Sequence, residues 1–296
     1  MTEIRNHQGE LDIKKLSRTI SLVENEVPGY EEILQRLKPS ASVIIGITGA
    51  PGAGKSSLVD GLIETMIGEG KSVAVLCVDP SSPFSLGALL GDRIRMSSWY
   101  DTPGVFIRSM ATRGALGGLN HKIIEVTDVL RDAAFDYIII ETVGVGQSEV
   151  DIASMADVTV VMLIPEGGDF IQNMKAGIME IADIFVVNKS DRPGADIFSN
   201  NLKKLLKAAR VADESIPVLQ TIASQKKGID ALYKMISLKK TVMNSQNKLA
   251  LLSEKTWNII KENKVKNIDR EDLKKRLQEE MIKENFNLYR FATKYF

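Results

Sequence analysis

The chain has few of the side chains that bind transition metals or form covalent cross-links. Among 296 residues there is one cysteine, Cys77, and there are two histidines, His7 and His121. A single cysteine excludes an intrachain disulfide, and the apolar run around it predicts a small buried side chain. The three residues lie far apart in the sequence, which disfavours a clustered thiol and imidazole metal site. So little cysteine is typical of a reducing compartment, and we expect a cytoplasmic protein.

The sequence also lacks an excess of one charge and a long apolar run. The 38 basic and 38 acidic residues give a formal net charge of zero, so the basic surplus typical of nucleic-acid-binding proteins is missing. No apolar run is long enough to span a membrane, and the first residues lack the hydrophobic core of a signal peptide. We therefore expect neither a nucleic-acid partner nor a membrane partner.

Short apolar runs alternate with segments of helical periodicity over most of the chain. The strand-like runs lie at 42–48, 72–78, 105–107, 137–140, 158–163, 184–187 and 218–221. Because runs that are apolar throughout are typical of strands covered on both faces, they predict a mostly parallel sheet. The alternation predicts βαβ units and a three-layer α/β/α fold. We place this domain at residues 41–240.

Helical segments are predicted on both sides of the α/β domain. Residues 1–40 form an N-terminal helical extension in this prediction, with a break at Pro28-Gly29. Residues 241–296 form a C-terminal helical arm, since from position 244 onward they contain no proline or glycine and keep helical spacing. The arm is rich in aromatic residues, which either a cap packed on the α/β domain or a dimerisation arm would bury.

Residues 49–56 match the phosphate-binding pattern G-x-x-x-x-G-K-S. The loop follows the run 42–48 and precedes a segment of helical spacing, so a helix N-terminus would face the phosphates. Its glycines permit backbone angles that turn successive N–H groups toward phosphate oxygens. We expect Lys55 to reach the β- and γ-phosphates and Ser56 to supply a hydroxyl to Mg²⁺. The pattern predicts a P-loop NTPase.

Residues 188–191, Asn-Lys-Ser-Asp, form the N-K-x-D pattern with which GTPases recognise guanine. The carboxylate of Asp191 can accept two hydrogen bonds from guanine, one from N1–H and one from the exocyclic amino group. Adenine offers no such pair of donors, and an unpaired buried carboxylate is costly, so we predict a strong preference for guanine. The pattern follows the run 184–187, at the carboxyl end of a predicted strand, where α/β folds bind ligands. The two motifs together predict GTP as the ligand.

Three acidic residues between the motifs are candidates to hold Mg²⁺ or its waters, an ion that needs one or two carboxylates. Asp79 follows the second predicted strand, Asp92 lies in a Leu-Gly-Asp-Arg segment, and Glu141 follows the run 137–140. Asp79 could instead open a proline turn, and Asp92 could cap a helix or be a solvated charge. Gly144 would let its N–H approach the γ-phosphate, unless the glycines there only form a flexible loop.

In this order the motifs resemble the MeaB/ArgK-type GTPases, the G-protein chaperones of methylmalonyl-CoA mutase. The resemblance covers 41–240 and rests on residues 49–56, 78–83, 90–93, 113–114, 116–119, 141–149, 188–191 and positions within 168–183. It implies a place in the dimer-forming NTPase class that contains the nickel-delivery and signal-recognition GTPases. It also implies that residues 166–183 are a mobile switch that communicates with the mutase.

The expected site residues follow from the motifs and from this resemblance. The GTP-binding set is Gly49, Ala50, Pro51, Gly52, Ala53, Gly54, Lys55, Ser56, Ser57, Gly144, Asn188, Lys189, Asp191, Ile222, Ala223 and Ser224, the last three by resemblance alone. The positions that the resemblance associates with Mg²⁺ are Ser56, Asp79, Asp92 and Glu141. Lys55 and Glu141 are expected to take part in hydrolysis, Lys55 by stabilising phosphate charge and Glu141 by holding Mg²⁺ through water. Gln147 is a candidate to position the attacking water.

The resemblance implies a magnesium-dependent, homodimeric GTPase that acts as a chaperone for an adenosylcobalamin-dependent acyl-CoA mutase and controls cofactor loading or protection. Hydrolysis is expected to be slow without the partner. The chain departs from the family pattern at 84–89, 110–112 and 166–170. These departures leave the nucleotide motifs intact, so a paralogous mutase or another cobalamin enzyme could be the client.

Two other functions compete with this prediction. One is a kinase of a transport system, although guanine selection fits a timing role better than metabolic phosphate transfer. The other is a metallochaperone GTPase that delivers nickel, which would need the cysteine and histidine cluster that this sequence lacks.

Overall fold

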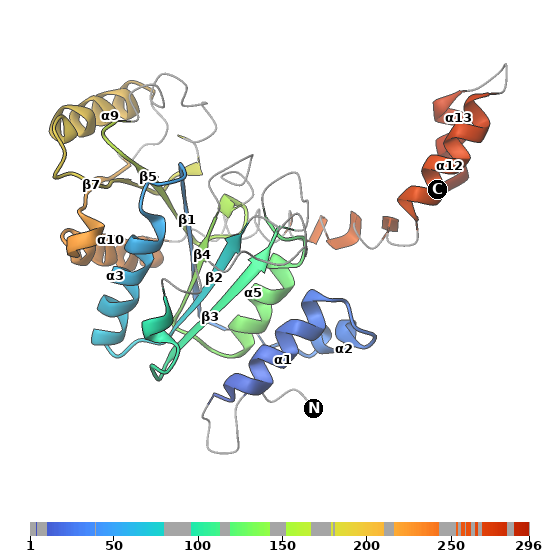
Figure 1. The fold of residues 1–296 in the computed structure, drawn as a ribbon, viewed down its shortest axis with the longest axis horizontal. Helices are drawn as coiled ribbons and strands as arrows, with labels where there is room; N and C mark the ends of the chain where they lie inside the picture. The colour runs from blue at the N-terminus through green and yellow to red at the C-terminus, as the bar shows by residue number, and fades with distance from the viewer. Residues whose placement is uncertain are drawn as a thin grey trace. The chain divides into compact units, whose positions relative to one another are not determined.

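The computed structural model describes residues 4, 11–38, 40–79, 96–112, 119–142, 152–166, 179, 181–209, 216–242, 253, 256–257, 259–261, 264–265, 268–282 and 287–295. The chain divides into two compact units, Met1–Asn244 and Ser245–Phe296. Figure 1 shows the helices and strands of both units. Within the described part of the chain, no helix is both long and apolar enough to cross a membrane.

A seven-stranded parallel sheet forms the centre of the first unit. Its strands are β1 (Val43–Gly49), β2 (Val73–Asp79), β3 (Val105–Ala111), β4 (Tyr137–Glu141), β5 (Val158–Leu163), β6 (Ile184–Val187) and β7 (Val218–Gln220). The strand order is β3-β2-β4-β1-β5-β6-β7, and every neighbouring pair is parallel. The prediction of an α/β fold is confirmed, with a sheet that is parallel throughout.

Helices cover both faces of this sheet, which gives the three layers that the sequence predicts. One face carries α3 (Lys55–Gly68) and α10 (Ile229–Val242), and the other carries α1 (Ile13–Glu24), α2 (Tyr30–Gln35), α5 (Ile123–Asp132) and α9 (Ala195–Ala209) (Figure 1). Successive residues of a strand point to opposite faces, so Ile45 packs with α3 and α10 while Ile44 packs with α1 and α5. Every residue of β1, β2, β4, β5 and β6 is buried.

The N-terminal helices belong to the first unit. The side chain of Asp12 caps α1 by accepting a hydrogen bond from Lys15 N at 2.9 Å. Leu16, Ile20 and Val23 of α1 are fully buried in the cluster that includes α5 and the sheet. Residues 11–35 therefore pack against the α/β domain and share its core.

The second unit contains α12 (Arg270–Met281), α13 (Leu288–Ala292) and the short 3₁₀ helix η3 (Thr293–Tyr295). Asp269 caps α12, where its carboxylate accepts hydrogen bonds from two backbone N–H groups. An ion pair of 2.9 Å between Lys294 and Glu280 joins the end of the chain to α12. Large apolar side chains of this unit are left in solvent, with Ile282 85% exposed and Tyr289 82% exposed.

Candidate functional site

The loop between β1 and α3 has the geometry of a phosphate cradle. β1 ends at Gly49 and α3 begins at Lys55, so the first turn of α3 opens directly onto the loop. Gly54 has a φ of +93°, in the left-handed region that favours glycine. A Cβ at Gly54 would also collide with the side-chain nitrogen of Asn188. Glycine is therefore required at position 54 both by its backbone conformation and by the Asn188 side chain packed against it.

Lys55 lies across this loop and is buried. Its Nζ donates to Gly49 O at 2.9 Å and to Ala50 O at 3.2 Å. These carbonyls hold the ammonium group over the loop, where it can move to a phosphate oxygen when one is present. Its predicted role in binding the β- and γ-phosphates stays a prediction.

Ser56 and Glu141 come together at the carboxyl end of the sheet. Ser56 Oγ donates to Glu141 Oε1 at 2.8 Å, although the two residues are 85 positions apart. Glu141 ends β4 and Asp79 ends β2, the strand paired with β4, and each residue is 5% exposed. The structure thus places three of the four predicted magnesium-associated residues at the ends of β2 and β4 or at the start of α3.

The donors at these positions fit a hard cation. A hydroxyl and carboxylates are oxygen ligands of the kind that Mg²⁺ takes, and in nucleotide sites the ion usually keeps phosphate and water ligands as well. The described residues hold no group of three or more His, Cys, Asp and Glu side chains that could bind a metal by themselves. Asp92, Gly144 and Gln147 lie outside the described residues.

Asn188 joins the phosphate loop to the two loops expected at the base. Its Nδ2 donates to Ala53 O at 2.7 Å, within the phosphate loop. Its Oδ1 accepts from Thr221 Oγ1 and from Ala223 N, both at 3.0 Å. The side chain is buried, with three of its hydrogen-bonding positions filled by the protein itself. Asn188 is therefore the fixed point around which the three ligand-binding segments are arranged.

The segments 188–191 and 221–224 lie side by side beyond the ends of β6 and β7. Ser190 donates to Thr221 O from both its backbone nitrogen, at 3.1 Å, and its hydroxyl, at 2.8 Å. Lys189 adopts a φ of +56°, which turns the chain between Asn188 and Asp191. Asp191 and Ser224 are exposed and Ile222 is half-buried. The Asp191 carboxylate is thus open to a ligand while its loop is held in place.

One contact beside this site was missed by the sequence reasoning. Glu166, the first residue of the predicted switch, accepts a hydrogen bond from Arg192 Nη1 at 2.6 Å. The Arg192 guanidinium lowers the pKa of Glu166 below its ordinary value. The acidic residue at 166 is visible in the sequence as a departure from the family, but its partner follows only from the adjacency of β5 and β6. The ion pair links the start of the switch segment to the residue after Asp191.

Residues 16–281 match the family model described as methylmalonyl Co-A mutase-associated GTPase MeaB. The chain belongs to the MeaB family of GTPases. A "Putative GTPase" of Pyrococcus horikoshii is 47% identical over 245 residues, which cover 81% of this chain and 77% of the relative. GTPase ArgK of Escherichia coli K12 is 36% identical over 256 residues, with coverages of 83% and 77%. The methylmalonic aciduria type A homolog of Caenorhabditis elegans, a mitochondrial protein, is 45% identical over 148 residues, 50% of this chain and 37% of its own.

Solved structures agree with the MeaB-family assignment. A crystal structure of a LAO/AO transport system kinase superposes with a TM-score of 0.65 and 25% identity, covering 96% of this chain and 92% of its own. HypB from Helicobacter pylori in complex with nickel superposes with a TM-score of 0.53 and 16% identity, covering 78% and 98%. The second likeness shows the fold alone. The resemblance to the MeaB/ArgK family stated from the sequence is confirmed.

Proposed function

We propose that this chain binds GTP together with Mg²⁺ and hydrolyses it slowly. We propose that the change from the GTP-bound to the GDP-bound form controls a protein partner. The observation that supports this most directly is the set of hydrogen bonds from Asn188 to Ala53, Thr221 and Ala223. They hold the phosphate loop and the two loops proposed to bind the base in one arrangement. Such preorganisation lowers the ordering cost of binding.

The roles of the residues follow from their positions. Backbone N–H groups of the phosphate loop and the first turn of α3 would bind the phosphates, and Asp191 would bind the guanine edge. Ser56 and Glu141 would hold Mg²⁺, with Asp79 and Asp92 as further candidates, and the ion would neutralise phosphate charge. Lys55 would leave the carbonyls of Gly49 and Ala50 to stabilise the charge on the γ-phosphate during attack by water.

The partner that we propose is an adenosylcobalamin-dependent acyl-CoA mutase of the methylmalonyl-CoA mutase type. Support comes from the description of the family and from the name of the Caenorhabditis elegans relative. In this proposal the GTP-bound and GDP-bound forms control loading or protection of the mutase cofactor, since γ-phosphate-dependent ordering of loops is an established way to signal nucleotide state. The single cysteine supports a reducing compartment, and we place the protein in the cytoplasm.

We also propose a homodimer. The second unit leaves Ile282 and Tyr289 largely exposed, and Trp257 in the same unit is 62% exposed. Several large apolar side chains exposed in one unit are the kind of surface that an interaction with another chain would bury. Sedimentation or light scattering of the full chain, with and without nucleotide, measures the oligomeric state.

Asp191→Ala tests guanine recognition. We expect the affinity for GTP to fall by about 100-fold or more, since two hydrogen bonds to a charged acceptor are lost, while the weak affinity for ATP stays the same. Asp196→Ala is the matched control, because Asp196 is an exposed aspartate nearby that bonds Gln220 on the protein surface. Calorimetric titration with GTP and ATP makes the comparison. An unchanged GTP/ATP preference in Asp191→Ala would show that the base-recognition proposal is wrong.

The partner is tested with purified cobalamin-dependent mutase and the protein held either in GDP or in a non-hydrolysable GTP analogue. Complex formation and cofactor transfer that depend on the nucleotide support the chaperone proposal. The solved neighbour described as a transport system kinase gives the second candidate a specific basis. Transfer of labelled γ-phosphate to a protein acceptor, rather than to water, would favour the kinase and overturn the chaperone.

A further inference from the structure

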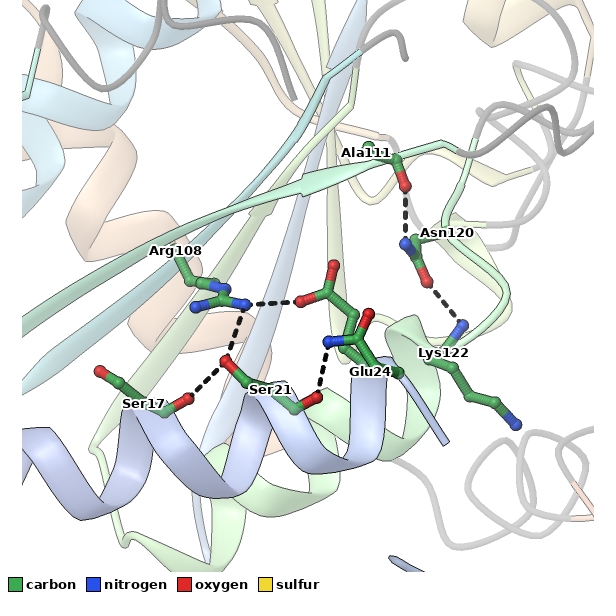
Figure 2. Close-up of polar contacts among 8 residues, drawn as sticks. Ser17, Ser21, Glu24, Arg108, Ala111, Asn120 and Lys122 are labelled. Carbon is green, nitrogen blue, oxygen red and sulfur yellow. Dashed lines mark hydrogen bonds and ion pairs between the residues drawn. The ribbon is translucent and has the colours of Figure 1, made fainter. Parts of the chain in front are cut away.

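A buried asparagine joins the end of β3 to the start of α5, as Figure 2 shows. Asn120 is 1% exposed, and its Nδ2 donates to Ala111 O at 2.6 Å. Its Oδ1 accepts from Lys122 N at 2.8 Å, which forms an Asx turn just before α5. The side chain therefore holds together two points of the chain that lie on either side of residues 113–118.

The peptide that Asn120 contacts also supports Asp79. β2 and β3 pair with Asp79 opposite Ala111, and Thr112 N donates to Asp79 O at 3.0 Å. Ala111 O and Thr112 N belong to one planar peptide group, so the group is held toward β2 by its N–H and toward Asn120 by its carbonyl. β3 is the edge strand of the sheet that the described residues form, and none of the described strands bonds its outer side. The Asn120 side chain instead bonds the outer side of β3, at the residue paired with Asp79.

Two sets of ion pairs fix this assembly to the N-terminal helices. Arg108 of β3 donates to Glu24 Oε2 at 2.6 Å and to Ser21 Oγ at 3.2 Å on α1 (Figure 2). Lys122 Nζ lies 2.9 Å from carboxylate oxygens of both Glu26 and Glu125. Burial of Lys122 disfavours its charge, but these two hydrogen bonds outweigh burial and raise its pKa well above the ordinary value. Lys122 is therefore charged at neutral pH, as its two ion pairs require.

We propose that Asn120 is a positioning residue for Asp79 and, through the peptide that joins Ala111 to Thr112, sets the affinity of the nucleotide site for Mg²⁺. This inference rests on the proposed function, in which Asp79 is one of the Mg²⁺-associated residues. Mg²⁺ demands near-ideal octahedral geometry, so a carboxylate on a loosened strand end binds it less well. Hydrogen-bonded supports of metal ligands commonly change metal affinity by about 10–100-fold when they are lost.

Two Asn120 variants separate positioning from helix capping. Asn120→Ala removes both hydrogen bonds of the side chain. Asn120→Asp keeps an acceptor for Lys122 N and hence the Asx turn, but it has no donor for Ala111 O. Thr127→Val is the matched control, because it removes another buried side-chain-to-backbone bond of α5, Thr127 Oγ1 to Ile123 O at 2.6 Å, without touching β3.

The measurement is the affinity for a fluorescent GTP analogue, titrated with Mg²⁺ and repeated in EDTA. In both Asn120 variants we expect the half-saturating Mg²⁺ concentration to rise by about 10-fold or more, with the EDTA affinity and guanine preference unchanged. Thr127→Val should match the wild type in both conditions. A wild-type Mg²⁺ dependence in Asn120→Asp, or an equal shift in Thr127→Val, would overturn the proposal.

A second measurement needs neither nucleotide nor metal. Hydrogen exchange at the Thr112 amide should be faster in both Asn120 variants and unchanged in Thr127→Val, because the bond from Thr112 N to Asp79 O is loosened. Asp79→Asn tests the metal role of Asp79 separately from the positioning role of Asn120. If it leaves the Mg²⁺ dependence unchanged, the metal role of Asp79 fails and the inference fails with it. If Asp79→Asn shifts the dependence and the Asn120 variants do not, only the inference fails.

Discussion

Acidic residues lie at both edges of the parallel sheet, and their surroundings differ. At the amino edge an aspartate comes directly before each of β4, β5 and β6. Each accepts a hydrogen bond from a backbone N–H of the neighbouring strand or of the residue just before that strand: Asp136 from Ser72 at 2.9 Å, Asp157 from Ile44 at 2.8 Å and Asp183 from Thr159 at 2.7 Å. Asp157 and Asp183 also donate their own N–H to the carbonyl of the same partner residue. Each carboxylate thus adds one hydrogen bond to the backbone ladder of the sheet at the point where a strand begins.

At the carboxyl edge the acidic residues face loops rather than the backbone of the next strand. Glu141 accepts from the Ser56 hydroxyl, and Asp191 is exposed on a loop that other residues hold in place. Comparing the two edges shows that an aspartate beside a strand is not in itself a sign of a ligand site. The donor that the carboxylate meets makes the distinction. A backbone N–H from the sheet fixes register, whereas the hydroxyl that Glu141 meets is a side chain in the first turn of α3, beside the glycine-rich loop.

Replacing one lysine at each edge should give the largest difference in GTP affinity between the two edges. Lys55→Ala should reduce GTP affinity by about 100-fold or more, since a buried charge that meets the phosphates is removed. Lys71→Ala, at the amino edge, removes an exposed lysine 3.8 Å from Asp136 and should leave GTP affinity unchanged. Both variants should stay folded, with a loss of about 1 kcal/mol or less for the exposed pair. Calorimetry and denaturant unfolding measure the two quantities, and GTP binding by Lys55→Ala at wild-type strength would contradict the assignment of the edges.

The fold could be predicted from the sequence to the extent that its determinants are local. β1, β2 and β4 are buried on both faces, so each appears as a continuous apolar run. β3 was predicted too short, at 105–107, because Arg108 and Ser109 interrupt its apolar run. The structure explains the interruption, since β3 is an edge strand and Arg108 pairs with Glu24 of α1. A charge inside a strand is tolerated where another element supplies its partner, and that partner lies 84 residues away.

The residues of the candidate site also fall into two groups, those that a continuous motif identifies and those whose contacts only the fold reveals. The phosphate loop and the guanine pattern are continuous in sequence, so their residues could be named without a structure. The contact of Asn188 with Ala53 depends on strand order, which a single sequence does not reveal. The contact of Asn120 with Ala111 depends on how the start of α5 lies against the end of β3. The amino-edge aspartates were not singled out, since an aspartate before a strand resembles an ordinary turn residue.

Asp157→Ala should remove a hydrogen bond at the amino edge of the sheet and lower the stability of the protein. The variant leaves the buried Ile44 N–H without its acceptor and removes the 3.5 Å ion pair with Arg131, so we expect the free energy of unfolding to fall by about 1–3 kcal/mol. Nucleotide affinity should not change. Asp128→Ala is the matched control, because Asp128 also lies near Arg131, at 4.0 Å, but bonds no strand in that contact. Equal stability losses in the two variants would show that the ion pair, not the bond to Ile44, is what matters at this edge.

Asp183 should have the smallest effect on the free energy of unfolding. The informative quantity is whether its contribution rises or falls as the pH increases. Burial raises the pKa of Asp183 above its ordinary value and outweighs the Thr159 N–H and Lys239, which both favour the charged form. The folded state therefore binds a proton more readily than the unfolded state, so this carboxyl's contribution to stability falls as pH rises from the ordinary aspartate pKa through the raised one. Asp183→Asn keeps an acceptor for Thr159 N and should remove that part of the pH dependence. Unfolding curves measured from about pH 4, near the pKa of an ordinary aspartate, up to about pH 7 cover the range in which the raised pKa of Asp183 acts. A wild-type stability that instead rises with pH through this window, by an amount that Asp183→Asn abolishes, would mean that the backbone hydrogen bond outweighs burial at this strand start.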